Sequence, residues 1–310
     1  MKRRSFLFSV LASIPLVNIY KIWASEVKNA PKEPRQYKDI QDFGDEIPFR
    51  CLVLGDWGTG GSLQKDVALG MNTYAEKNPI QAIISTGDNI YGSGVESVHD
   101  KQWKTKYENI YTGQFIQKPW YAILGNHDHR GNTEAQIEYA KINNAWHMPS
   151  NYYSTIFQAG NGTVELFAID TTPFTKGKQE EQLKWLDTSL QDSKADWKIV
   201  TGHHMMRSYG VYKDQQFMLK HIKPLLDKHK VSLYMCGHDH DMQLINNPDD
   251  AFIHVTSGAG GGSRDTAYGE FSLYAATNGG FAALTISSKV LLINIMDKTG
   301  TLQFAHALKK

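Results

Sequence analysis

The feature that most constrains the fold of this chain is a pattern that occurs five times: a short apolar run, a glycine and a polar block. The runs are 51–54, 82–84, 121–124, 199–200 and 233–236, and the blocks begin at Gly55, Gly87, Gly125, Gly202 and Gly237. Such runs are typical of buried strands, and the loops that follow strands often carry chemistry. Because ligands of open α/β sheets gather at the carboxyl ends of strands, we expect the five blocks to meet in one crevice.

The blocks are GDWG, GDNIY, GNHDH, GHH and GHDH, and they contain seven potential metal ligands. These residues are Asp56, Asp88, Tyr91, Asn126, His203, His238 and His240. A glycine before each ligand has a physical use, because glycine tolerates a positive φ and lets the backbone turn tightly without a clashing side chain.

The donor atoms indicate which metals would bind. Carboxylate, phenolate, amide oxygen and imidazole form a mixed oxygen and nitrogen set without thiolate, which suits iron, manganese or zinc better than Cu(I) or an iron-sulfur cluster. Tyr91 lies three residues after Asp88. A phenolate is a strong donor for trivalent iron, so Tyr91 favours Fe(III) at one position.

Each block taken alone is also compatible with a plain loop, since Asp and Asn after glycine are ordinary turn residues. A single histidine such as His238 is more often a hydrogen-bonding residue than a ligand. Turn chemistry does not explain Tyr91, however, nor the H-x-H spacing that ends at His240. The five blocks together therefore favour a site for two metals.

With these motifs, the sequence resembles the purple acid phosphatases of the small, tartrate-resistant type, in the calcineurin-like metallophosphoesterase superfamily. The likeness runs from about residue 48 to near the carboxyl terminus and includes 123–150, 224–243 and the loop 257–260. The resemblance implies that Fe(III) is bound by Asp56, Tyr91 and His240, that a divalent metal (Fe, Zn or Mn) is bound by Asn126, His203 and His238, and that Asp88 bridges the two. His127 matches the histidine that contacts the substrate phosphate.

The expected activity is that of an acid phosphatase acting on phosphate monoesters, either small molecules or phosphoproteins. Two metals about 3.5 to 4 Å apart clamp phosphoryl oxygens and activate water. Since Fe(III) is the stronger Lewis acid, we expect attack by a metal-bound hydroxide at mildly acidic pH, without a phosphoenzyme. His127 would assist as a general acid or stabilise charge on the transferring group.

Two other functions remain open on the sequence alone. A phosphodiesterase or nucleotidase would use the same site, and comparing a monoester with a diester would separate it from a monoesterase. A non-hydrolytic diiron protein, with a redox or phosphate-sensing role, would bind iron and cleave no phosphate ester.

The sequence departs from the family pattern at one place. Family members often have His-Tyr-Pro after the fourth glycine and a further histidine nine residues past the ligand, where this chain has His203-His204-Met205 and Tyr212. Tyr212 can donate a hydrogen bond but carries no positive charge at acidic pH. His204 is either a compensating group or a solvent-facing loop residue.

Several neighbours of the blocks have two readings each. Asp128, His129 and Asp239 are either partners that orient the ligands or solvated loop residues. Arg207 and Arg264 could meet a phosphate, although most arginines at such positions face water. The loop 258–262 lacks the Lys-Ser/Thr of a P-loop, so we expect a tight loop beside the site.

The amino terminus predicts export. Residues 2–7, Lys-Arg-Arg-Ser-Phe-Leu, precede an apolar stretch to about Ile19, which is short for a membrane span and is typical of a signal peptide. The paired arginines resemble a twin-arginine signal, so the export machinery of that route is an expected partner. The expected location is the bacterial periplasm or the medium, without a stable membrane partner unless the signal stays uncleaved as an anchor.

We therefore divide the chain into a signal peptide (1–24), a polar lead-in (25–47) and one catalytic domain (48–310). The formal net charge of the chain is +1, and loss of the four basic residues in 1–24 changes it to −3. This charge does not indicate a nucleic-acid surface. Cys51 and Cys236 lie in strand-like runs, so two buried thiols are favoured over a disulfide.

The order of the remaining elements predicts an α/β fold, a four-layer αββα sandwich of two mixed sheets flanked by helices. Helices are expected at 63–77, 101–111, 133–143, 179–193 and 215–229, and further strands at 152–157, 163–169, 251–256, 280–286 and 291–295.

Overall fold

The five apolar runs are strands in the computed structural model, which describes residues 43, 45–177 and 179–310. These strands are β1 (Phe49–Leu54), β2 (Ala82–Ser85), β3 (Trp120–Ala122), β7 (Trp197–Thr201) and β8 (Leu233–Cys236). β1, β2 and β3 pair in parallel in one sheet, and β7 pairs in parallel with β8 in the other. The carboxyl ends of the strands in each group therefore lie at one edge of their sheet, as the sequence predicts.

Each sheet is mixed and contains seven strands. The first sheet has the order β14-β13-β12-β1-β2-β3-β4, and the second has the order β11-β9-β10-β8-β7-β6-β5. The additional strands are β4 (Trp146–His147), β5 (Tyr153–Ala159), β6 (Gly162–Ala168), β9 (Met242–Ile245), β10 (Ile253–Ser257), β11 (Ser272–Ala276), β12 (Gly280–Ile286), β13 (Val290–Asp297) and β14 (Leu302–Lys309). The antiparallel strands lie on one side of the first sheet, whereas in the second sheet antiparallel pairs occur at both edges, β11-β9-β10 at one and β6-β5 at the other.

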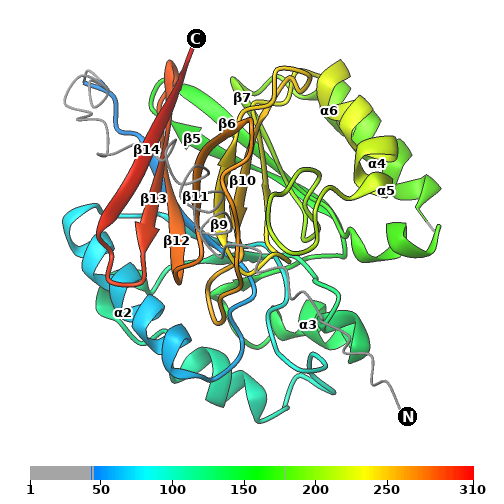
Figure 1. Ribbon diagram of the computed structural model, residues 1–310. Helices are drawn as coiled ribbons and strands as arrows, with labels where there is room; N and C mark the ends of the chain where they lie inside the picture. The colour runs from blue at the N-terminus through cyan, green and yellow to red at the C-terminus, as the bar shows by residue number, and fades with distance from the viewer. Residues whose placement is uncertain (1–42, 44, 178) are drawn as a thin grey trace, which may run out of the picture. The chain divides into compact units, whose positions relative to one another are not determined.

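Helices cover the outer faces of the two sheets, as Figure 1 shows. They are α2 (Ser62–Lys77), α3 (Thr133–Tyr139), α4 (Glu180–Asp192), α5 (Gln216–His221) and α6 (Lys223–Lys228). Among the described residues, no helix is both long enough and apolar enough to cross a bilayer.

Alternation along β1 explains the layers. Val53 belongs to the core between the sheets, together with Leu166 and Leu233, whereas Leu52 and Leu54 belong to the core under α2. Successive side chains of a strand point to opposite faces, so one apolar strand supplies two cores. A third core lies between the second sheet and α4, α5 and α6. The four-layer αββα fold is confirmed.

Three of the predicted helices differ from the structure, and the one expected at 133–143 already ends at Tyr139. The segment 215–229 is two helices, because Pro224 lies in the first turn of α6 and has no N–H to continue α5. The segment 101–111 contains a π-helical turn, Lys104–Glu108, in which Asn109 N–H donates to the Lys104 carbonyl.

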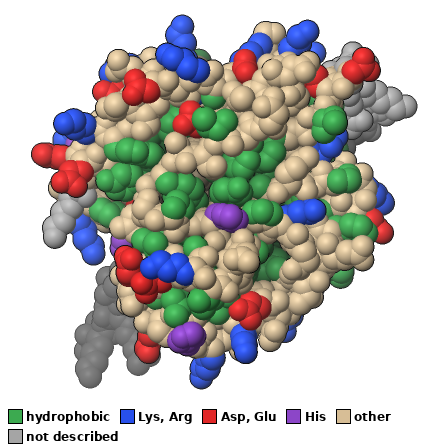
Figure 2. Space-filling view, turned by 180° about the vertical axis from the view of Figure 1, so that it is seen from behind, with side chains coloured by type: hydrophobic (Ala, Val, Ile, Leu, Met, Phe, Trp, Pro, Cys, Tyr) green, Lys and Arg blue, Asp and Glu red, His purple; other side chains and the backbone are tan. Residues whose placement is uncertain are grey.

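The expected signal peptide lies outside the described residues, as does most of the expected lead-in. Glu46, near the end of that lead-in, is anchored on the domain: its carboxylate accepts from Ser288 Oγ at 2.6 Å and from Ser288 N at 2.9 Å. Cys51 and Cys236 are free and buried, in agreement with the favoured interpretation. The face shown in Figure 2 carries acidic and basic side chains interspersed around apolar ones, without a continuous basic stripe.

Candidate metal centre

The seven predicted ligands come together at the carboxyl ends of the parallel strands, in two groups that meet at Asp88. In the first group the Tyr91 hydroxyl lies 2.8 Å from Asp56 Oδ1 and 2.9 Å from His240 Nε2. His240 Nε2 in turn lies 3.3 Å from Asp56 Oδ1. A carboxylate, a phenol and an imidazole thus face one point.

The second group surrounds His203. Its Nε2 lies 3.1 Å from Asn126 Oδ1, 3.2 Å from His238 Nδ1 and 3.5 Å from Asp88 Oδ2. Ligand atoms of Asp56, Asp88 and His203 all lie within 4.8 Å of one another, so the two groups form one cluster. We refer to these seven residues as the ligand cluster.

The arrangement around His203 fits a cation. His203 Nδ1 lies 2.9 Å from the Thr86 carbonyl and must carry a proton to donate to it, which leaves Nε2 as an acceptor in the neutral ring. That nitrogen faces the amide oxygen of Asn126 and the carboxylate of Asp88, which are acceptors as well. Acceptors that converge in this way require a cation or a proton between them.

The shifted pKa values of His203, Asp88 and Tyr91 have the same cause, the convergence of buried polar and charged groups. Burial lowers the pKa of His203, but the carboxylates of Asp88 and Asp56 outweigh it and raise the pKa to about 10. Burial raises the pKa of Asp88, yet His203 and the hydrogen bonds to it hold that pKa well below its usual range. Burial, followed by Asp56 and Asp88, raises the pKa of the Tyr91 phenol far above its ordinary value. A phenolate at this position therefore needs bound positive charge.

Three of the seven residues have a left-handed backbone. The φ angles are 58° at Asp56, 52° at Asp88 and 68° at His238. Non-glycine residues in this region cost about 1 to 3 kcal/mol each and tend to occur at functional sites, where the surrounding structure enforces them. The expectation that the preceding glycines take the positive φ is right only at Gly87, with φ 92°.

The glycines are required instead by close approach between the blocks. A Cβ at Gly125 would lie 2.2 Å from Asp88 Oδ1, and a Cβ at Gly237 would lie 2.2 Å from Asp56 Oδ2. Backbone N–H groups also cross between blocks, because His127 N donates to Asp88 Oδ1 and His238 N donates to Asp56 Oδ2, both at 2.8 Å. Each carboxylate is therefore held by the block beside it.

Asp128 and Asp239 are buried and bonded, not solvated. Asp128 accepts from the backbone N–H groups of Gly125, Asn89 and Ile90 and from Gln136 Nε2, so it fastens the second block to the third. Asp239 accepts from Ser208 Oγ at 2.5 Å and from Tyr212 N at 3.2 Å. It positions the loop that carries Tyr212.

His127 lies at the open side of the ligand cluster and is partly exposed. Its ring centroid is 4.5 Å from that of Tyr91, and its Nδ1 lies 2.7 Å from the Gly92 carbonyl. Donation from Nδ1 to this carbonyl leaves Nε2 as the ring atom able to meet a substrate.

Tyr212 and His204 both contact His238. The Tyr212 ring stacks on the His238 ring with centroids 4.3 Å apart and planes at 19°. His204 is 4% exposed, and its Nδ1 lies 2.8 Å from Thr171 Oγ. The solvent-facing interpretation of His204 is therefore wrong, because the ring packs behind His238.

The two candidate arginines differ in their surroundings. Arg207 makes a bidentate ion pair with Asp250, with both bonds at 2.9 Å, and is committed to it. Arg264 lies beside the ligand cluster, where its backbone N donates to the His240 carbonyl at 2.7 Å. The expected tight loop precedes it, with a Cβ at Gly261 only 2.4 Å from the Trp57 carbonyl.

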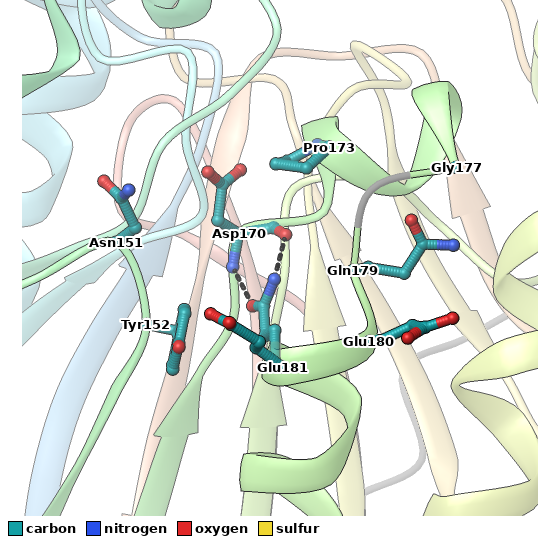
Figure 3. Close-up of a pocket in the computed structure, with 9 residues that line it drawn as sticks. Asn151, Tyr152, Asp170, Pro173, Gly177, Gln179, Glu180 and Glu181 are labelled. Atoms are coloured by element: carbon teal, nitrogen blue, oxygen red, sulfur yellow. Dashed lines mark hydrogen bonds between the residues drawn. The ribbon is translucent and has the colours of Figure 1, made fainter.

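Sequence reasoning missed Asp170, which follows β6 as the ligand blocks follow their strands, but without a glycine. Asp170 Oδ2 lies 2.8 Å from His129 Nε2, so His129 is a partnered residue rather than a solvated one. Asp170 also lines a cavity of about 440 Å³, shown in Figure 3, together with Tyr152, Glu180 and Glu181. None of the seven predicted ligands lines this cavity.

Two mixed sheets between helices, with these seven donors at the ends of their parallel strands, define the chain as a metallophosphoesterase. Residues 49–242 match the family model described as calcineurin-like phosphoesterase. The chain is 36% identical over 277 residues to purple acid phosphatase 3 of Arabidopsis thaliana, which covers 80% of this chain and 74% of that protein. It is 31% identical over 297 residues to tartrate-resistant acid phosphatase type 5 of Oryctolagus cuniculus, which covers 84% and 91%. The chain belongs to the purple acid phosphatases of the calcineurin-like phosphoesterase family.

A solved structure shows why the site must be considered apart from the fold. GAP50, the anchor in the inner membrane complex of Plasmodium, superposes with a TM-score of 0.77 at 26% identity, over 85% of this chain and 89% of that chain. Its name describes an anchor, and one fold supports many functions. An assignment of activity therefore depends on the donor set.

Proposed function

We propose that this chain is an acid phosphatase that hydrolyses phosphate monoesters at a dinuclear centre of Fe(III) and a divalent metal, Fe, Zn or Mn. The observation that carries the proposal is the ligand cluster, in which two groups of donors meet at Asp88. Its relatives named purple and tartrate-resistant acid phosphatases support the same activity.

The iron would be held by Asp56, Tyr91 and His240. The divalent metal would be held by Asn126, His203 and His238, and Asp88 would bind both metals. When bound, the cations would supply Lewis acidity to the phosphoryl oxygens and activate the attacking water. The raised pKa of Tyr91 means that a phenolate between two carboxylates needs bound positive charge, which a trivalent ion would supply; the choice of iron rests on the phenol donor itself and on the family.

His127 would act on the leaving-group side. Hydrolysis joins the water oxygen to phosphorus, breaks the ester P–O bond and transfers a proton to the departing oxygen. His127 can bring that proton on Nε2, since Nδ1 is held by the Gly92 carbonyl. Because a positioned general acid contributes about 10²- to 10⁴-fold, His127→Ala should lower kcat by that range. Full turnover in this variant would remove the assignment.

The test of the proposal is metal content measured together with the visible spectrum and hydrolysis of the pure protein. We expect about two metals per chain, at least one of them iron, a visible band that disappears in Tyr91→Phe, and faster cleavage of 4-nitrophenyl phosphate than of bis(4-nitrophenyl) phosphate. Faster diester cleavage would favour the phosphodiesterase alternative. Iron binding without cleavage of either ester would favour the non-hydrolytic diiron alternative.

We also propose export by the twin-arginine route to the periplasm or the medium. The support is the paired Arg3 and Arg4 before an apolar stretch. This route carries folded proteins, which suits a site loaded with metal before transport. Replacement of both arginines by lysine should abolish export, and undiminished export would overturn the proposal.

A further inference from the structure

Tyr212 and Arg264 form a pair beside the ligand cluster, which we call the rim pair. Arg264 Nη1 donates to the Tyr212 hydroxyl at 2.8 Å. The Tyr212 ring stacks on His238, and the Arg264 backbone N–H is bonded to the His240 carbonyl. Both members therefore contact predicted ligands directly, Tyr212 at His238 and Arg264 at His240.

The positions of both residues are fixed by buried groups. Tyr212 N donates to Asp239, which is itself held by Ser208. Arg264 follows the glycine loop, in which Gly258 N donates to the Asp241 carbonyl and Gly260 N donates to the Gly55 carbonyl. The guanidinium is therefore presented from a backbone that is fastened to the first and fifth blocks.

Among the described residues Arg264 makes no ion pair, although burial raises the pKa of the nearby Asp239 carboxyl and the charge of Arg264 counters that rise. Within residues 43, 45–177 and 179–310, its guanidinium makes one hydrogen bond, to Tyr212, and has no carboxylate within 4.0 Å. Arg207 differs, because Asp250 and Asp214 occupy its donors. Tyr212 is 40% exposed, so the rim pair is open to solvent. A fixed, unpaired guanidinium at the edge of a phosphate site is a donor set for a second anion.

We propose that the rim pair is an anion subsite that binds a negatively charged group on the leaving-group side of the substrate, such as a second phosphate. The inference rests on the proposed phosphatase function and adds a preference within it, for terminal phosphates, ester or anhydride, whose leaving group is itself anionic. Nε and Nη2 of Arg264 can donate in parallel to two oxygens of one phosphate while Nη1 stays on Tyr212.

The test compares ADP with AMP. Cleavage of the terminal phosphate of ADP releases an anionic leaving group, whereas AMP releases a neutral nucleoside. Since a hydrogen bond to a charged group is commonly worth tenfold or more, Arg264→Gln should lower kcat/KM for ADP by about tenfold or more, mainly through KM. We expect a change of less than about twofold for AMP, because no second anion is present, and partial retention of the ADP preference in Arg264→Lys.

The matched control is Lys213→Gln, which removes one positive charge next to Tyr212. The Lys213 ammonium lies against the Tyr209 carbonyl, 3.4 Å away, so this variant should keep the wild-type ratio between the two substrates. A second measurement does not depend on turnover: methylenediphosphonate should bind the metal-loaded Arg264→Gln protein about tenfold more weakly than wild type, and methylphosphonate equally well.

Two results would overturn the subsite. One is equal loss on ADP and AMP in Arg264→Gln with unchanged metal content, which would make Arg264 a positioning residue for the ligand cluster. The other is an equal shift in Lys213→Gln, which would indicate general electrostatics. Failure of the wild-type protein to cleave AMP, ADP or 4-nitrophenyl phosphate would instead overturn the proposed function, so the two failures are distinguishable.

Discussion

A buried histidine outside the ligand cluster should make this protein less stable in acid. His254, on β10, is 1% exposed, and among the described residues neither of its ring nitrogens has a hydrogen-bond partner. Burial lowers its pKa from 6.5 to about 3, with Asp250 opposing the shift and Arg207 and Lys223 adding to it. The folded protein therefore resists a proton that the unfolded chain accepts.

The direction and the size of this pH effect on the free energy of unfolding follow from proton linkage. Above pH 6.5 neither state binds the proton at His254, and the stability is fully present. As the pH falls from 6.5 towards 3, only the unfolded chain takes up the proton, which costs up to about 1.4 kcal/mol per pH unit. Between pH 8 and pH 5 this one group should lower the free energy of unfolding by about 2 kcal/mol.

The assay is urea denaturation at pH 8 and pH 5, with wild type and His254→Leu compared at equal metal loading. The loss of unfolding free energy between the two pH values should be smaller in His254→Leu by about 2 kcal/mol. Protonation of the metal ligands affects both proteins alike and cancels in this difference. His99→Gln is the control, since His99 is exposed and its replacement leaves the core intact.

An identical pH dependence in wild type and His254→Leu would refute the reasoning. It would mean that the folded protein opens to let His254 take up a proton near its ordinary pKa. A loss in wild type that begins only below about pH 4 would refute it as well.

Three further predictions concern the buried residues that support the ligand cluster and the bound metals. Gly125→Ala should reduce kcat at least tenfold, as the new Cβ would displace Asp88 Oδ1, and steady-state kinetics with metal analysis would check this; unchanged activity would contradict the close approach. Asp128→Asn should cost about 1 to 3 kcal/mol in urea denaturation, because the amide turns a donor towards the N–H groups that the carboxylate accepts, whereas the exposed Asp192→Asn should be neutral. Removal of metal by a chelator should lower the melting temperature, and readdition should restore it; an unaffected melting temperature would argue against a structural contribution of bound metal.

The parts of the fold that the sequence predicted are those with strong local patterns. β1, β2 and β8 contain apolar runs that are followed by a glycine, directly in β1 and β8 and after two intervening residues in β2, and each strand is fully or almost fully buried. β4, β9, β11 and β14 were not predicted; β4 has two residues and β9 four, which is too short for a clear pattern. β11 is only partly buried and β14 has exposed ends, so their apolar patterns are weak, and their pairing is set by distant strands rather than by local preference.

The ligand cluster could be predicted because its residue types are rare in combination. The residues that support it could not, since an Asp such as Asp128 or Asp239 has the same local appearance whether it is solvated or buried. Tyr212 illustrates the limit further. The sequence shows that a positive charge is missing there, but only the fold shows that Arg264, 52 residues away, supplies one.

The close packing between the five blocks restricts which substitutions the metal site can accept during evolution. Because Gly125 is packed against Asp88 and Gly237 against Asp56, a substitution in one block demands a compensating substitution in another. Single-step evolution of a new metal preference is therefore obstructed at the base of the crevice. The Tyr212 ring stacks on His238, but among the described residues neither the Tyr212 hydroxyl nor the Arg264 guanidinium is hydrogen-bonded to a ligand side chain. Paralogues and laboratory libraries should therefore acquire new substrate ranges there first.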